Sequence, residues 1–88
     1  MFPYTEKIID NINYRTFTQN IDQHELVWHR DEEDREVTAL HSTDWKVQLE
    51  NELPQTITKI TIPKGVYHRV IKGTGTLEVK IKKFYEFK

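Results

Sequence analysis

With 88 residues, 13 Lys and Arg against 14 Asp and Glu, and no cysteine, the chain has the size of one small domain and a nearly balanced charge. This balance argues against a dedicated nucleic-acid-binding protein, which usually carries a basic excess. No apolar stretch approaches the roughly 18 residues of a membrane span, and neither a signal-peptide pattern nor cysteine usage points to secretion. We therefore expect a cytoplasmic protein with one domain over residues 1–88 and no membrane or nucleic acid as a partner.

The first 14 residues are predicted to form an N-terminal arm that precedes the main domain. Within this arm, Thr5–Ile12 suits one or two helical turns, with Thr5 as the N-cap and three isoleucines on one face. An extended arm lying against the domain fits the same residues equally well. Both alternatives leave residues 15–88 as the folded unit.

Residues 15–88 have the pattern of a β-protein. Seven short runs are rich in β-branched and aromatic residues or alternate apolar with polar residues: 15–19, 25–29, 36–40, 45–50, 57–62, 66–71 and 77–82. Turn residues separate these runs, and no convincing long helix is present. Short strands at this close spacing predict an all-β fold, an antiparallel double-sheet sandwich or barrel.

Two segments carry residues suited to bind a metal. His29 and Asp31 stand two positions apart, so on a strand their side chains point to the same face. His68 follows a turn formed by Pro63-Lys64-Gly65 and opens another strand-like run. Two imidazoles and one carboxylate form the ligand set that suits divalent iron and related metals. We therefore predict a metal site of His29, Asp31 and His68.

The arrangement resembles the cupin superfamily of small jelly-roll barrels. The second motif of this family has Pro-x-Gly followed by a histidine three residues later, which Pro63, Gly65 and His68 match. The first motif begins with His-x-His, for which this chain has His29 and Asp31. Aspartate therefore stands where the family has its second histidine.

The first motif departs from the family pattern in a second place. The family has a glutamate after its histidine pair; here Arg35 falls at that position, and Glu36 fits only the longer of the two family spacings. The resemblance implies a jelly-roll barrel with a pocket. Cupins include metal-dependent dioxygenases, isomerases, epimerases, storage proteins and sensors, so the fold does not fix an activity or a set of catalytic residues.

Each site residue also has a structural interpretation. The two histidines can be hydrogen-bonded rings without a chemical role, and Asp31 can be one of four acids in a solvated turn over residues 31–34. An inward Arg35 either pairs with Asp31 or binds the carboxylate or phosphate of a ligand.

Taken together, these residues predict a pocket in which His29, Arg35 and His68 contact a small polar or anionic ligand. His29, Asp31 and His68 would hold a divalent metal, either Fe, Zn, Mn or Ni. The alternative is a non-catalytic binding or assembly protein that keeps the barrel without a metal.

Several large apolar residues fall on strand faces turned away from this pocket. Leaving them in water would forfeit much of the stability of a small domain without disulfides. Either the N-terminal arm, with its Phe2, Tyr4, Ile8 and Ile9, covers them, or they form a homodimer interface with two-fold symmetry. We predict the homodimer, through Leu26, Trp28, Leu40, Tyr67 and Ile71.

Overall fold

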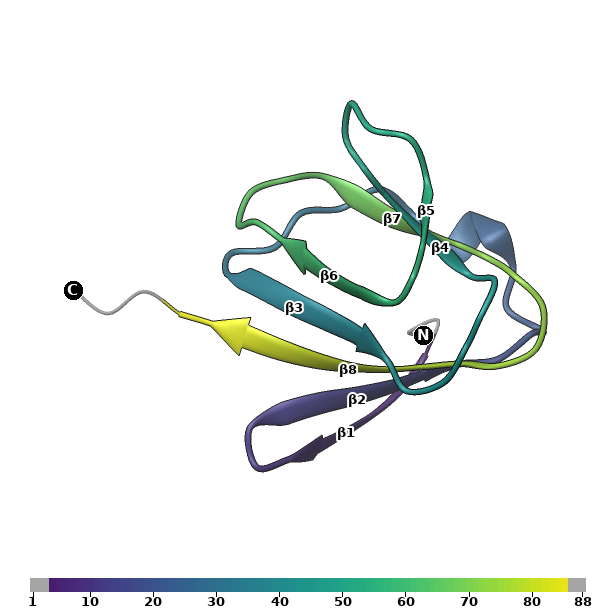
Figure 1. Cartoon of the computed structure of the whole chain (residues 1–88), viewed down its shortest axis with the longest axis horizontal. Coiled ribbons are helices and arrows are strands. Elements are labelled where there is room, and N and C mark those ends of the chain that lie inside the picture. Colours follow the sequence, from purple (N-terminus) through teal and green to yellow (C-terminus); the bar gives the residue numbers. More distant parts are fainter. Residues whose placement is uncertain (1–3, 86–88) are drawn as a thin grey trace.

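The structure, a computed structural model of the chain, describes residues 4–85. This part of the chain folds into two antiparallel sheets and one short 3₁₀ helix (Figure 1). The larger sheet has the strand order β1-β2-β8-β3-β6, and the smaller has the order β5-β4-β7. The elements are β1 (Thr5–Ile9), β2 (Ile12–Phe17), η1 (Gln23–Glu25), β3 (Asp34–Ala39), β4 (Lys46–Leu49), β5 (Gln55–Thr56), β6 (Lys59–Ile62), β7 (His68–Ile71) and β8 (Leu77–Phe84).

The core lies between the two sheets because alternate residues of the strands point inward. β8 shows this most clearly: Leu77, Val79 and Ile81 are buried, and the lysines and glutamate between them are exposed. Trp45, directly before β4 of the smaller sheet, is fully buried and donates its indole N–H to the carbonyl of Thr74 at 3.1 Å. The predicted all-β, antiparallel double-sheet fold is therefore confirmed.

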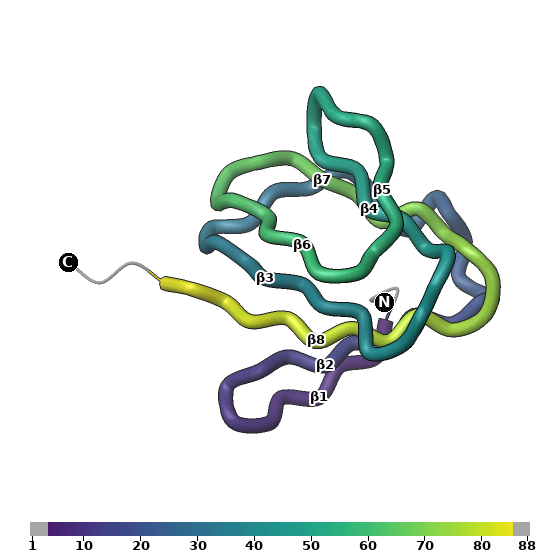
Figure 2. The backbone as a smooth tube through the Cα atoms, viewed as in Figure 1, coloured from purple at the N-terminus to yellow at the C-terminus, as the bar shows by residue number. Residues whose placement is uncertain are grey.

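The N-terminal segment forms a β-hairpin, so the helical alternative for residues 5–12 was wrong. β1 pairs with β2, which in turn pairs with β8 at the centre of the larger sheet (Figure 2). Asp10 and Asn11 connect the two strands, and both have positive φ, at 51° and 66°. Two such residues make the tight turn whose twist matches a hairpin, and Asp and Asn are among the residues that tolerate it. This local turn chemistry favours the strand over the helix.

The predicted strand at residues 25–29 is absent, and this prediction was wrong. Asp22 caps η1 by accepting a hydrogen bond from the backbone N–H of His24 at 2.9 Å. The side chain of Gln23 then ties this turn to the end of β7, through the carbonyl of Val70 and the N–H of Lys72. The turn sends Leu26 into the core, where it is buried, so Leu26 does not belong to an outward apolar face.

One outer face of the molecule carries exposed aromatic residues, each directly before one of the two bridged histidines, His29 and His68. Trp28 and Tyr67 are each 42% exposed, and arginines stack on both rings: Arg69 on Trp28 at 4.9 Å, and Arg30 on Tyr67 at 5.5 Å. The N-terminal segment does not cover this face because β1 lies at the edge of the larger sheet, where Ile8 and Ile9 are themselves exposed. Phe2 lies outside the described residues. Over residues 4–85, no helix is long and apolar enough to cross a membrane.

Candidate metal centre and cavity

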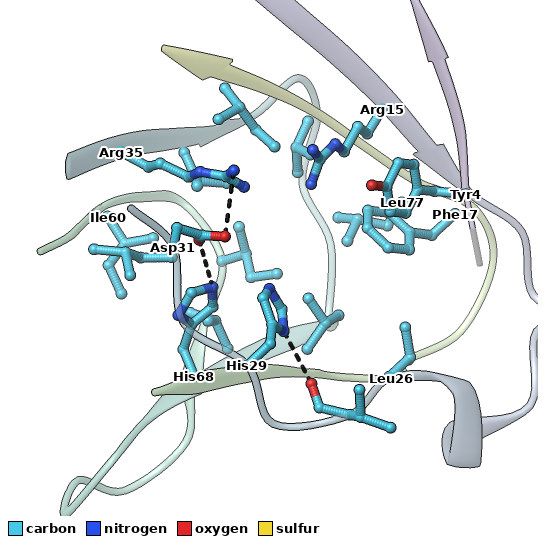
Figure 3. Close-up of a pocket in the computed structure, with 18 of the residues that line it drawn as sticks. Tyr4, Arg15, Phe17, Leu26, His29, Asp31, Arg35, Ile60, His68 and Leu77 are labelled. Atoms are coloured by element: carbon cyan, nitrogen blue, oxygen red, sulfur yellow. Dashed lines mark hydrogen bonds and ion pairs between the residues drawn. The ribbon is translucent and has the colours of Figure 1, made fainter. Parts of the chain in front are cut away.

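A cavity of about 400 Å³ lies in the interior, bounded by residues of both sheets. Most of its wall is aliphatic or aromatic, and its polar groups are few (Figure 3). His29, Asp31, Arg35 and His68 line one part of it, and Arg15 projects into it from the larger sheet. Such a mainly apolar cavity with a few convergent polar groups is the usual form of a small-molecule site.

Backbone hydrogen bonds hold the two predicted motifs together. His29 and His68 form a bridge in which each N–H donates to the other's carbonyl, at 3.0 and 2.8 Å. Next to this bridge, the N–H of Gly65 donates to the carbonyl of Asp31 at 3.0 Å. Gly65 has φ of +79°, a conformation that glycine adopts without the steric penalty of a Cβ. The Pro-x-Gly turn thus fixes His68 opposite His29.

Both imidazoles are oriented by the backbone. The Nδ1 of His29 lies 3.0 Å from the carbonyl of Val27, and the Nδ1 of His68 lies 2.9 Å from that of Val66. A carbonyl oxygen can only accept, so each Nδ1 carries the proton and donates it. In a neutral ring, Nε2 then has a free lone pair, which is the arrangement that metal-binding histidines require.

Asp31 completes this group. Its Oδ2 lies 3.2 Å from the Nε2 of His68, and its side chain is only 11% exposed. Within the described residues this buried oxygen has no hydrogen-bond donor unless the His68 ring is protonated. Desolvation is the largest influence on His68 and lowers the pKa of its imidazole, which favours the neutral ring. Two lone pairs then face each other across 3.2 Å, an arrangement that a cation between them would stabilise.

The three side chains offer one ligand atom each, and these atoms all lie within 4.8 Å of one another. The two rings are themselves close, with centroids 4.3 Å apart. His68 is buried, whereas His29 is exposed beside Val27 at the cavity wall, so the centre is open to solvent on that side. A zinc-like ion held by all three would need each of these atoms about 2.0–2.2 Å from a common centre.

Arg35 faces the cavity and Glu36 does not, which answers a question that the sequence left open. The Nη2 of Arg35 lies 3.3 Å from Asp31 and 2.8 Å from Glu33, and its Nε donates to the same Glu33 oxygen at 2.9 Å. Lys83 approaches Glu33 at 3.9 Å. Arg35 therefore lies against both Asp31 and Glu33 and balances part of their charge.

Sequence reasoning missed Glu33 and Arg15. Glu33 was assigned to a solvated turn, but it is buried because β3 begins at the next residue and carries it inward with Arg35. Arg15 shares the inward face of β2 with the buried Asn13 and Phe17, two positions away on either side, so the period-two pattern of that strand contained the signal. Its Nε bonds to Glu6, and its guanidinium lies over the ring of Tyr4 at 4.2 Å.

Comparison with known proteins identifies the architecture. No protein-family model and no curated protein matches the sequence, so the evidence comes from solved structures. An RmlC-like cupin family protein with a double-stranded β-helix fold from Methanocaldococcus jannaschii superposes with a TM-score of 0.69 at 13% identity, covering 92% of this chain and 79% of that one.

The chain has the cupin fold.

A cupin domain from Bordetella pertussis superposes similarly, with a TM-score of 0.63 at 19% identity over 93% of this chain and 92% of that chain. FeII HppE in complex with substrate gives a TM-score of 0.64 at 12% identity and covers 96% of this chain, but only 54% of that one. The resemblance expected from the Pro63–His68 turn is thus confirmed at the level of the fold.

Proposed function

We propose that this cupin-fold protein binds a divalent transition metal through His29, Asp31 and His68, next to a cavity that admits a small molecule. The observation that carries the proposal is the buried Oδ2 of Asp31, which lies 3.2 Å from the Nε2 of His68 and has no hydrogen bond within the described residues. An unsatisfied buried carboxylate oxygen costs free energy that a bound cation would recover.

The donor set indicates which ions fit. Two imidazoles and one carboxylate suit iron(II), zinc, manganese or nickel, and the structurally similar HppE is named as an FeII protein. Three protein ligands leave positions at the metal for water or a ligand. A metal held this way would act as a Lewis acid or support oxygen chemistry, whereas the protein's residues hold the ligand in place.

The remaining residues explain how the site tolerates its charges. Arg35 shares one guanidinium between Asp31 and Glu33, and its contact with Oδ1 of Asp31 leaves Oδ2 available for the metal. The backbone carbonyls of Val27 and Val66 fix which ring nitrogen of each histidine points at the ion. These contacts are the supporting shell that a metal centre needs.

A second candidate is a binding or assembly protein that uses the cavity without a metal. The position of Arg35 favours this alternative because it supplies a positive charge beside Asp31, at the place where the resemblance to the cupin pattern implies a glutamate. In this case the histidines would contact the bound molecule directly.

Metal analysis of the purified protein separates the two candidates. We expect close to one equivalent of a transition metal in the unmodified protein and almost none in a His29→Gln, His68→Gln double variant. The matched control is His24→Gln with His41→Gln, since both of these histidines are exposed and lie outside the cavity. Equal metal content in all three proteins, or no bound metal in the unmodified protein after reconstitution, would refute the metal centre and favour the metal-free candidate.

A further inference from the structure

The larger sheet presents a second cationic group to the cavity, separate from the metal ligands. Arg15 lies on the inward face of β2, opposite Val79 of β8, and its side chain is only 12% exposed. Figure 3 shows its guanidinium directed into the cavity that His29 and Asp31 also face. A largely buried guanidinium at a ligand cavity is costly unless its donors find acceptors.

The contacts of Arg15 leave part of its hydrogen-bonding capacity unused. Its Nε donates to Glu6, whereas its two terminal amino groups have no hydrogen-bond partner among residues 4–85. Burial raises the pKa of Glu6, but hydrogen bonds from Arg15 and Asn13 outweigh burial and leave that pKa below its usual value. The pair is therefore ionic, and stacking on Tyr4 at 4.2 Å keeps the guanidinium plane fixed.

The two arginines of the cavity differ in the number of carboxylates that they contact. Arg35 is engaged by two carboxylates: its Nε and Nη2 contact Glu33, and its Nη2 also contacts Asp31. Arg15 is engaged by one, that of Glu6. The geometry thus leaves a pair of oriented donors on Arg15 for a planar anionic group, which the guanidinium fork matches.

We propose that the cavity binds a small organic acid with an apolar body, whose carboxylate is held by Arg15. The walls set the character of the body: Phe17, Val37, Ile60 and Leu77 are among the apolar residues around it. A volume of about 400 Å³ equals that of about 13 water molecules at about 30 Å³ each, so the acid is of medium-chain or single-ring size.

This inference rests on the proposed function in one respect. The far end of the acid would lie at the centre formed by His29, Asp31 and His68, which is where a bound metal would act on it. A divalent ion with one aspartate and two neutral imidazoles keeps one net positive charge, so it also favours an anionic ligand. Binding of the carboxylate to Arg15 does not itself require the metal.

Calorimetric titration with hydrocinnamate, octanoate and the uncharged hydrocinnamyl alcohol tests the proposal, in metal-free and in zinc-loaded protein. We expect at least one of the acids to bind, and hydrocinnamate to bind about tenfold or more tightly than the alcohol. Arg15→Gln should remove this preference, and Arg15→Lys should keep only part of it. Arg69→Gln is the matched control, because Arg69 stacks on the exposed Trp28 outside the cavity.

The outcomes separate this inference from the proposed function. Equal affinity for acid and alcohol in the unmodified protein, or no binding of either acid, would overturn the carboxylate site, and this comparison does not depend on a variant that folds. Acid binding that survives Arg15→Gln but disappears on metal removal would place the carboxylate on the metal instead. Acid binding that depends on Arg15 in a protein that takes up no metal would uphold this inference and refute the metal centre.

Discussion

Replacing Arg35 with Met tests the charge arrangement of the site. The side chains of Arg35 and Asp31 are each 11% exposed, and that of Glu33 is 9% exposed, so solvent screens this cluster little. Removing the guanidinium leaves two buried carboxylates, with Lys83 3.9 Å from Glu33 and the imidazole of His68 3.2 Å from Asp31. Breaking a buried ion pair by removing one partner costs about 3–5 kcal/mol, a large part of the roughly 5–15 kcal/mol that stabilises a small domain.

We expect urea denaturation, followed by circular dichroism, to show a loss of about 3 kcal/mol or more for Arg35→Met. Adding Glu33→Gln should recover part of that loss because one of the two uncompensated charges disappears. Lys59→Met is the matched control: Lys59 pairs with Glu36 at 3.8 Å, but its side chain is 68% exposed, and such surface pairs contribute about 0–1 kcal/mol. A loss below about 1 kcal/mol for Arg35→Met would refute the argument that this cluster is a tightly coupled buried network.

Three further predictions concern the surroundings of the site. Gly65→Ala should lower the free energy of unfolding by about 1–2 kcal/mol, since φ is +79° there although open space surrounds the position, and Gly75→Ala, at φ +71° and equally open, should lose a similar amount. Urea denaturation that shows a loss below about 0.5 kcal/mol for Gly65→Ala would contradict this steric argument. Hydrogen bonds from the backbone N–H and the hydroxyl of Thr74 hold the pKa of Asp44 below 3.8. The ionised carboxylate of Asp44 should therefore stabilise the fold above pH 3.8, and this stabilisation should disappear as the pH falls through the lowered pKa. A pH profile of stability that Asp44→Asn leaves unchanged would contradict this expectation. The homodimer remains a proposal, now through Trp28, Leu40, Tyr67 and Ile71 without the buried Leu26. Sedimentation should show a dimer that Trp28→Glu dissociates, and a monomer at micromolar concentration would refute it.

Sequence patterns predicted those elements of the fold that alternation and turn residues specify. β3, β4, β6, β7 and β8 all fall within or across predicted runs, because alternating apolar residues bury one face of a strand whatever surrounds it. The N-terminal hairpin and η1 depend on a two-residue turn and on one capping aspartate, short signals that the overall pattern of residues 5–12 and 25–29 concealed. In these two segments the turn and the cap decide the local structure, against the helix or strand propensity of the residues around them.

The candidate site was predictable to a similar extent. The turn over residues 63–65 identified His68, and spacing identified His29 and Asp31, although the structure joins these residues through a single bridge and not a regular strand. Glu33 and Arg15 escaped because their roles depend on which face of the sheet closes the cavity, a tertiary property that no short segment contains. The cytoplasmic location stays a prediction.

Crystallisation with zinc, followed by an anomalous difference map, tests the metal centre most directly. The account predicts one strong peak about 2.0–2.1 Å from the Nε2 atoms of His29 and His68 and about 2.0–2.2 Å from an oxygen of Asp31. It also predicts that Nδ1 of each ring keeps its carbonyl partner and that Arg35 stays beside Asp31. A zinc-containing crystal with no peak between these three side chains, or with the imidazole of His68 turned away from Asp31, would contradict the proposed metal centre.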